Sequence, residues 1–311
     1  MIKTLIDFPD YSHANPWQIK TIETCAPFDI LRTLDFSLST CTFFHISWED
    51  CLLHNCKTYQ EGLKRVEQVE KILKAQAKIS KIAWTLHNEN SHSKIDKNCE
   101  LQLREVIMEH ASIIFLMSAK HLFKIPVKYK HKVKILPHYI EENPLKKVDK
   151  LRDPCFLKFG ANRGDKFSSL YENILNNDLI FKFVSDVNVN KEILNYSNTI
   201  IKRRFTIHEL NLYSRLANFS LFLRNSNFNS GIMNFLIGNY IAVYHDVESV
   251  KFMDIPEVLK KFQINNIDLK FEFYHDDIIN TKEYKKEIEN FIMERSPLKV
   301  STAFWNSVLS C

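Results

Sequence analysis

The chain has 311 residues, of which 45% are hydrophobic and 25% charged, and its formal net charge is +5. This length allows two domains of roughly 150 residues, each with its own core, and the composition is that of an ordinary globular protein. The small charge excess is spread over both halves, which argues against a nucleic-acid-binding protein, whose basic residues would gather on one face.

The first half of the chain alternates between strand-like and helix-like segments. The segment 59–77 predicts an amphipathic helix, because its apolar residues recur every three or four positions. Alternating strands and helices of this kind predict parallel βαβ units. The other segments expected here are strands at 2–8, 41–46, 79–86, 111–117 and 133–136, and helices at 101–110 and 118–123.

A charged, proline-containing stretch at 141–154 predicts a linker, after which the pattern starts again. Two α/β units of similar size predict two Rossmann-like domains that face a cleft, with boundaries at 1–145 and 146–295, and a final segment at 296–311. The elements expected after the linker are strands at 155–159, 180–185, 198–201, 219–223 and 240–244, and helices at 167–176, 207–216, 231–237, 282–293 and 300–309.

Polar clusters follow several of the expected strands. In an open α/β sheet, ligands bind beyond the carboxyl ends of the strands, so these clusters are candidate site segments. Glycine is scarce, and of the five in the chain, Gly160, Gly164 and Gly231 lie inside or next to the clusters, which indicates a backbone need for them. The clusters are FFHISWE (43–49), WTLHN (84–88), LPHY (136–139), FGANRGDK (159–166) and NSNFNSG (225–231).

Each cluster has a functional and a purely structural interpretation. His87 ends a strand, where an imidazole can exchange hydrogen bonds near neutral pH, or it belongs to a polar turn. Arg163 and Lys166 lie between a strand and a helix, where they bind an anion or form a solvated turn. Ser230 is a good helix cap, and the helix start also suits a phosphate.

The order of the five clusters, with a basic pair in the second half and a Ser-Gly opening a helix, resembles the GT-B glycosyltransferases of bacterial capsule, lipopolysaccharide and exopolysaccharide synthesis. The resemblance implies an α/β fold of two Rossmann-like domains whose last helix crosses back to the first domain. It also implies an enzyme that transfers a sugar, hexosyltransferase-like, from a nucleotide-sugar donor.

For the donor, the resemblance implies that Arg163 and Lys166 hold the diphosphate and that Asn229, Ser230 and Gly231 meet a donor phosphate. The paired glutamates of many retaining members are missing, because Asn229 and Met233 stand near their places. The chain also lacks Asp-x-Asp, the usual metal–diphosphate motif of the other major glycosyltransferase fold. The resemblance implies a UDP- or GDP-linked donor, and the missing Asp-x-Asp motif leads us to expect no cofactor and no metal.

For the acceptor, His87, Asn88 and His92 resemble a Trp-Thr-Val-His-Asn motif with a later histidine. His45, Trp48 and Glu49 resemble a His-x-His-Trp-Pro-Glu-like motif, although Ser47 and Asp50 depart from it. The resemblance implies that His45, Trp48, Asn88 and His92 bind the acceptor. It makes His87 the catalytic-centre residue, with Glu49 as the competing base.

Three functions remain open at the level of sequence. The leading one is metal-independent sugar transfer to a surface-polysaccharide or lipid-linked glycan. The second is a non-catalytic GT-B-like nucleotide-sugar-binding or scaffold subunit. The third, a metal hydrolase using a cluster such as His45, His54, His87 and His92, lacks the tight ligand spacing of known metal sites.

The cellular location of the protein can be predicted from its N-terminus, its apolar segments, its cysteines and one lysine-rich stretch. The N-terminus lacks the apolar core of a signal peptide, and no apolar run approaches the ~20 residues that span a bilayer. Seven cysteines without a regular spacing favour free thiols in a reducing compartment. The lysine-rich stretch 119–134 fits either an anionic membrane surface or a solvated face. We expect a cytoplasmic protein, with peripheral binding to the cytoplasmic face of the inner membrane as the alternative.

Overall fold

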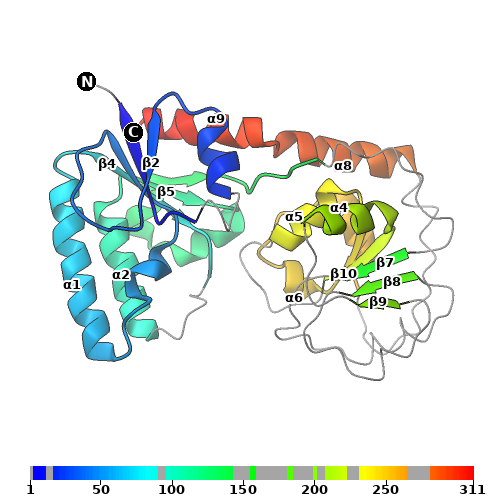
Figure 1. Cartoon of the computed structure of the whole chain (residues 1–311), viewed down its shortest axis with the longest axis horizontal. Coiled ribbons are helices and arrows are strands. Elements are labelled where there is room, and N and C mark those ends of the chain that lie inside the picture. The colour runs from blue at the N-terminus through cyan, green and yellow to red at the C-terminus, as the bar shows by residue number, and fades with distance from the viewer. Residues whose placement is uncertain are drawn as a thin grey trace. The chain divides into compact units, whose positions relative to one another are not determined.

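The computed structural model describes residues 3–11, 17–89, 96–142, 155–158, 181–184, 199–201, 207–222, 231–264 and 281–311. The chain forms two compact units, Met1–Tyr139 with Pro297–Cys311, and Ile140–Ser296. Each unit contains one parallel sheet (Figure 1). The boundaries expected from sequence, after residues 145 and 295, lie near the limits of these units. The predicted cleft between them stays a prediction.

The sheet of the first unit has six strands in the order β2-β1-β3-β4-β5-β6, and every neighbouring pair is parallel. The strands are β1 (Thr4–Phe8), β2 (Asp29–Arg32), β3 (Phe43–Ile46), β4 (Lys81–Leu86), β5 (Ile113–Leu116) and β6 (Val133–Ile135). From β1 the chain moves to one side, to β2, and from β3 it moves to the other side. The strand order therefore reverses between β1 and β3.

Helices cover both faces of this sheet. On one face, α1 (Tyr59–Gln76) and α2 (Lys97–His110) lie side by side (Figure 1), and a capping box between Thr58 and Glu61 starts α1. The other face packs against η1 (Ile19–Glu23) and the last helix, α9 (Pro297–Leu309), whose Phe304 and Trp305 are buried in the same core. Trp305 Nε1 donates to the carbonyl oxygen of Ile22 at 2.7 Å. The prediction that the last helix returns to the first domain is confirmed.

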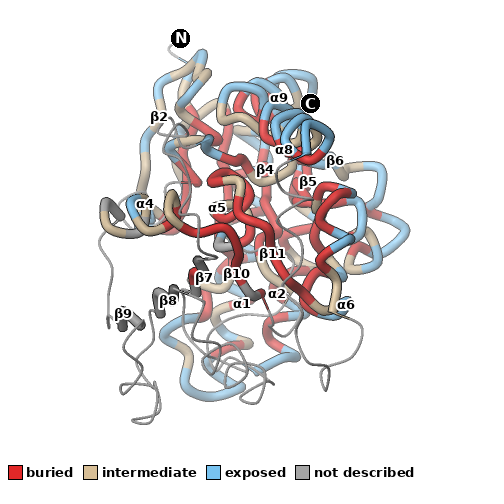
Figure 2. The backbone as a smooth tube through the Cα atoms, turned by 90° about the vertical axis from the view of Figure 1, so that its right-hand side faces the viewer, coloured by how far each residue is buried: buried red, intermediate tan, exposed pale blue. Residues whose placement is uncertain are grey.

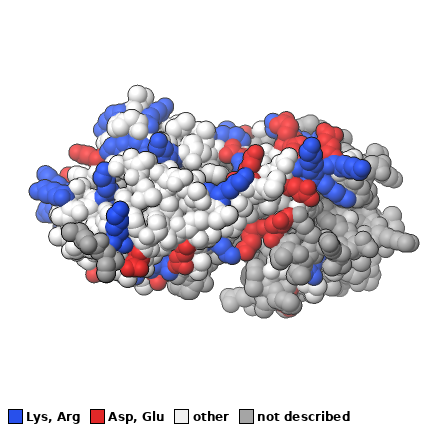
Figure 3. Space-filling view, turned by 90° about the horizontal axis from the view of Figure 1, so that it is seen from above, with Lys and Arg blue, Asp and Glu red and all other residues white. Residues whose placement is uncertain are grey.

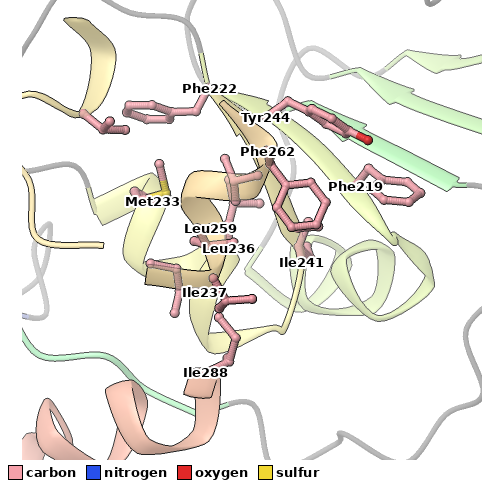
Figure 4. Close-up of a cluster of buried hydrophobic side chains, with 14 of the residues drawn as sticks. Phe219, Phe222, Met233, Leu236, Ile237, Ile241, Tyr244, Leu259, Phe262 and Ile288 are labelled. Carbon is pink, nitrogen blue, oxygen red and sulfur yellow. The ribbon is translucent and has the colours of Figure 1, made fainter. Parts of the chain in front are cut away.

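The second unit has a five-stranded parallel sheet in the order β11-β10-β7-β8-β9. Here the order reverses between β7 and β10. Residues of β10, α5, β11, η6 and α8 form its buried apolar cluster (Figure 4), and β10, β11 and α5 are largely buried (Figure 2). The elements are β7 (Cys155–Lys158), β8 (Phe181–Val184), β9 (Thr199–Ile201), α4 (Ile207–Leu216), β10 (Phe219–Phe222), α5 (Gly231–Gly238), β11 (Ala242–His245), α6 (Val247–Val250), η6 (Glu257–Phe262) and α8 (Lys282–Glu294).

One glycine of the second unit is explained by a close approach. A β-carbon added at Gly238, where α5 ends, would run into the main-chain oxygen of Glu141 and would crowd Ile140. A β-carbon added at Gly231, where α5 begins, would meet no atom of the described residues within 4 Å. Packing therefore requires glycine at residue 238, whereas the described residues leave room for a side chain at residue 231.

The described helices and strands agree with the sequence-based expectations except for short elements. Edge strand β2 was missed, because its four residues are only partly buried and show little apolar pattern. The helix expected at 118–123 is a 3-10 helix, η3 (Ala119–Lys124), and the following turn, η4 (Val127–Lys132), is of the same type. The helix expected at 167–176 lies outside the described residues. Also missed were η1, η2 (Glu49–Leu53), η4, α6 and η6.

On the face drawn in Figure 3, lysine and arginine occur in several places and alternate with aspartate and glutamate. Among the described helices, none is both long and apolar enough to cross a bilayer. The described cysteines at 25, 41, 51, 56, 99 and 311 are free thiols.

Candidate active site

The predicted residues of the first unit gather where its strand order reverses. β1 ends at Phe8 and β3 at Ile46, and these two residues are paired in register. Trp48 and Glu49 follow β3 directly, and His87 follows the neighbouring strand β4. The reversal point at the carboxyl ends of parallel strands is where open α/β sheets bind ligands. The topology thus brings the segments 43–49 and 84–88 to one edge of the sheet.

His87 is enclosed by two tryptophans. Its ring stacks on Trp48 with centroids 4.4 Å apart and planes 14° apart, and the Trp17 ring lies nearly perpendicular to it, with centroids also 4.4 Å apart. The residue is only 7% exposed, and within the described part of the chain its Nε2 has no hydrogen-bond partner. Burial lowers the pKa of His87 well below its usual value, with His138 and His45 adding to the effect.

This environment keeps His87 a neutral imidazole at physiological pH. A buried polar atom without a partner is unfavourable and calls for an explanation, which a catalytic role would provide. In the neutral ring one nitrogen carries a proton and the other offers a lone pair. His87 can therefore accept a hydrogen bond from a hydroxyl or donate one to a sugar, and its lowered pKa makes it a weaker proton acceptor than a free imidazole.

Glu49, the competing base, is bound to Arg104 of α2 and to Trp84 of β4. Its Oε1 binds Arg104 Nε at 2.9 Å and Arg104 Nη2 at 2.8 Å, and its Oε2 accepts a hydrogen bond from Trp84 Nε1 at 3.3 Å. Burial raises the pKa of Glu49, whereas Arg104 acts in the opposite direction. Both carboxyl oxygens of Glu49 are therefore already bonded, and the choice between His87 and Glu49 as the base stays a prediction.

His45 lies in a buried hydrogen-bond network. Its Nδ1 contacts Asp7 Oδ1 at 2.8 Å, and its Nε2 contacts Thr85 Oγ1 at 2.8 Å. Asp7 also accepts bonds from Ser47 Oγ at 2.6 Å and from Gln18 Nε2 at 2.7 Å. All five residues are fully buried. In this arrangement His45 links β1, β3 and β4. Both of its ring nitrogens are bonded to protein side chains, so neither is left to bind an acceptor sugar.

The remaining acceptor candidates differ in what the structure says of them. Trp48 is 9% exposed, and its ring is covered by His87, Trp17 and Tyr11. Asn88 is partly exposed, and its main-chain oxygen accepts a bond from Arg104. His92 lies outside the described residues. Acceptor binding by these side chains stays a prediction.

Four residues of these networks were not predicted from the sequence: Arg104, Asp7, Gln18 and Thr85. Asp7 carried one signal, because a carboxylate inside an apolar strand needs buried partners. No feature of the sequence distinguishes Arg104. Charged residues are common on an amphipathic helix, and the spacing of Arg104 does not show that it faces inward.

In the second unit, the two donor segments follow the strands on either side of the reversal point. The segment with Arg163 and Lys166 begins after β7, and the segment with Asn229 and Ser230 begins after β10. These four side chains lie outside the described residues, whereas Gly231 is the first residue of α5. Gly231 thus opens the helix that follows β10, as the sequence predicted.

The described residues do not support the metal-hydrolase hypothesis. No group of three or more His, Cys, Asp or Glu residues in the described ranges is arranged to hold a metal ion. Those ranges include His45, His54 and His87 but not His92.

Stability should depend on pH through the buried histidines. Burial lowers the pKa of His138 to about 4, and its Nδ1 lies 2.8 Å from the Tyr139 carbonyl oxygen. The unfolded chain, with a histidine pKa near 6.5, then binds more protons than the folded chain as the pH falls. Unfolding free energy should therefore decrease, for His138 by about 2 kcal/mol between pH 7.5 and pH 5.

Denaturant titrations of the parent and of His138→Gln at the two pH values measure this effect. The variant should show a weaker pH dependence, whereas His131→Gln, at an exposed position, should match the parent. An identical pH dependence in His138→Gln and the parent would contradict the assignment.

Comparison with known proteins places the fold. No family model matches the chain, and no curated relative matches it. HepE from Anabaena, solved with UDP, superposes with a TM-score of 0.62 at 9% identity over 100% of both chains. Sucrose-phosphate synthase from Thermosynechococcus elongatus gives a TM-score of 0.58 at 11% identity over 86% of this chain and 72% of the other.

The chain has the GT-B fold. A third similar structure is the N-terminal domain of trehalose-6-phosphate phosphatase from Candida albicans, with a TM-score of 0.58 at 9% identity over 100% of this chain and 97% of that one. Identities this low establish the GT-B fold that the sequence predicted, and activity must be argued from the site.

Proposed function

We propose that this GT-B protein transfers a sugar from a nucleotide-sugar donor to a surface-polysaccharide or lipid-linked glycan. The observation that carries the proposal is the topology of the second sheet. Its strand order reverses between β7 and β10, and the two segments that begin after these strands are those with Arg163, Lys166 and Gly231. Nucleotides bind α/β sheets at this kind of reversal point.

The donor segments have the charges that a leaving nucleoside diphosphate needs. Charge builds on the diphosphate as the glycosidic bond breaks, so fixed cations stabilise the transition state more than the ground state. Arg163 supplies a planar pair of donors and Lys166 a point charge. The amino end of α5, which begins at Gly231, adds the partial positive charge of a helix start. The donor is held without a metal ion, and UDP in HepE favours a uridine nucleotide.

In the first unit, His87 carries the chemistry at the acceptor. In an inverting enzyme, its neutral ring accepts the proton of the attacking hydroxyl. In a retaining enzyme, the leaving phosphate takes that proton and His87 orients the sugar. Trp48, Asn88 and His92 are the residues we assign to the acceptor, and His45 bonds to Asp7 and Thr85 in the same unit.

A panel of UDP-, GDP- and CMP-sugars tested by thermal shift, with and without EDTA, checks this function. One nucleotide class should raise the melting temperature to the same extent in both conditions. A shift that depends on added metal would contradict the metal-free donor site, and no shift with any nucleotide would contradict the function.

A specific observation keeps a second function open, a non-catalytic GT-B-like nucleotide-sugar-binding or scaffold subunit. Met233, near the place of a glutamate in many retaining enzymes, is 2% exposed and belongs to the apolar core. The usual carboxylate contact with the donor ribose is therefore missing at this residue. Donor binding without turnover would favour the scaffold function.

We also propose that a surface of the first unit, the η3–η4 surface (residues 119–135), rests on the anionic cytoplasmic face of the inner membrane. Phe123 is 56% exposed and Val127 is 81% exposed. Exposed lysines at 120, 128, 130 and 134 lie in the same stretch. Apolar side chains among cations are typical of surfaces that bind acidic lipid head groups, and a lipid-linked acceptor would be found there.

The double variant Phe123→Asp/Val127→Asp should bind vesicles that contain phosphatidylglycerol at least about tenfold more weakly than the parent. Burying each apolar side chain contributes roughly 1.5–3 kcal/mol, and each added carboxylate is repelled. Sedimentation with such vesicles, and with phosphatidylcholine alone, measures the effect. Leu101→Asp, an exposed leucine on α2, is the matched control and should bind like the parent. Equal binding by the double variant and the parent would contradict the membrane surface.

A further inference from the structure

Arg104, on α2, connects the two loops that hold His87 and Trp48. Its Nη1 donates to the Glu89 carbonyl oxygen at 2.8 Å, and its Nη2 donates to the Asn88 carbonyl oxygen at 3.1 Å. The same guanidinium binds the Glu49 carboxylate through Nε at 2.9 Å and Nη2 at 2.8 Å. Asn88 and Glu89 follow His87 directly, and Glu49 follows Trp48. One side chain thus joins the loop after β3 to the loop after β4.

The surroundings of Arg104 make this connection rigid. The residue is 8% exposed, and its Nη2 also lies 2.8 Å from Glu100 Oε1, one turn earlier on α2. Lys124 Nζ, on η3, forms an ion pair with Glu89 Oε1 at 2.8 Å. All three nitrogens of the guanidinium are engaged, in the planar fork that only arginine provides. A lysine at this position could neutralise Glu49, but its three donors sit on a single nitrogen and could not reach the separate positions of the two carbonyl oxygens and the carboxylate.

Arg104 acts on His87 through the backbone and does not touch its ring. Alternate residues of a strand face opposite sides of a sheet, so Trp84, which bonds to Glu49, faces the α2 side. His87 lies on the other side, against Trp17 of the segment that leads into η1. The stack of His87 on Trp48 therefore depends on how the two loops are held relative to each other, and Arg104 is bonded to both.

We propose that Arg104 is a positioning residue, which fastens the loop 47–49 to the loop 87–89 and so keeps His87 stacked on Trp48 in its working position. The proposal rests on the proposed function, because it assigns Arg104 a part in the chemistry of His87. It adds a residue on the far side of the sheet to that site.

Arg104→Lys tests the proposal, because it keeps the charge beside Glu49 and removes the two carbonyl contacts. We expect kcat to fall by about tenfold to a hundredfold, as small misplacements of catalytic groups do, with little change in the donor KM. A His87 ring that is less tightly held is better hydrated, so its pKa should rise. The pH below which kcat falls should therefore move to a higher value. The titratable and charged groups around these loops are His45, His138, Glu49, Glu89, Glu100 and Lys124.

Lys97→Gln, which removes a charge from the exposed start of the same helix, is the matched control and should behave like the parent. If Arg104→Lys does not fold at the assay temperature, Arg104→Gln combined with Glu49→Gln, which removes both charges of the buried pair, provides a second variant. Unchanged kcat and an unchanged pH dependence of kcat in a folded Arg104 variant would overturn the proposal.

A measurement without turnover separates this proposal from the proposed function. The ring resonance of His87, assigned by its loss in His87→Phe, can be titrated by NMR in the parent and in Arg104→Lys. A higher ring pKa in Arg104→Lys supports the positioning role even if the parent proves to have no transferase activity, which would contradict only the function. Equal ring pKa values would overturn the positioning role.

Discussion

Replacing His87 with alanine is expected to lower turnover by a factor on the order of 10²–10⁴, which is the usual contribution of a positioned acid or base. Donor affinity should stay close to that of the parent, since His87 belongs to the first unit and the donor segments to the second. Initial rates on folded protein and a nucleotide titration measure the two quantities separately.

Two further variants make the test specific. His87→Phe keeps an aromatic ring in contact with Trp17 and Trp48 but has no nitrogen, so it should lose turnover as fully as the alanine variant. His54→Ala, at an exposed position, should keep it. Near-normal turnover in His87→Phe would remove His87 from the chemistry. In that case Glu49→Gln, which is gentler than alanine on the buried pair with Arg104, becomes the variant to measure.

Replacing Arg163 or Lys166 with alanine is expected to weaken nucleotide binding by roughly 1.5–3 kcal/mol each, the cost of losing a charge-assisted contact. That cost corresponds to an affinity loss of about ten- to a hundredfold for each variant. Turnover should fall further, because the same cations stabilise the departing diphosphate. Calorimetric titration with UDP measures the affinity.

Lys251→Ala provides the matched control, because Lys251 is an exposed cation of the same unit. It should bind UDP like the parent. Parent-like affinity in both Arg163→Ala and Lys166→Ala would show that the diphosphate binds elsewhere, and the segment 159–166 would then be a solvated turn.

Buried strands and long helices were predictable, because their apolar patterns are repeated several times along each element. The expected helix at 59–77 corresponds to α1 at Tyr59–Gln76, and the expected helix at 207–216 corresponds to α4 at Ile207–Leu216. Single-turn elements such as η2 and α6 contain too few residues to repeat a pattern. Edge strand β2 was not predicted for a related reason. One side of an edge strand faces solvent, where almost any residue is tolerated, so no clear apolar pattern develops.

The site was predictable only where a polar residue ends a strand. His87, Trp48 and Glu49 were found in this way, and the structure brings them to one edge of the sheet. What these residues contact could not be derived, because Arg104 is 55 residues from Glu49 in sequence. For the same reason, His45 was expected to bind an acceptor and instead bonds to Asp7 and Thr85, which lie on two neighbouring strands.

The central claim is that this GT-B protein transfers a sugar from a nucleotide donor. The measurement that tests it most directly is release of nucleoside diphosphate from radiolabelled UDP- and GDP-hexoses, in EDTA, with a bacterial lipid extract as the source of acceptor. The account predicts that one donor releases its diphosphate, that the label passes into the lipid phase, and that His87→Phe does neither. Diphosphate release no greater than that of His87→Phe, for every donor in the panel, would contradict it.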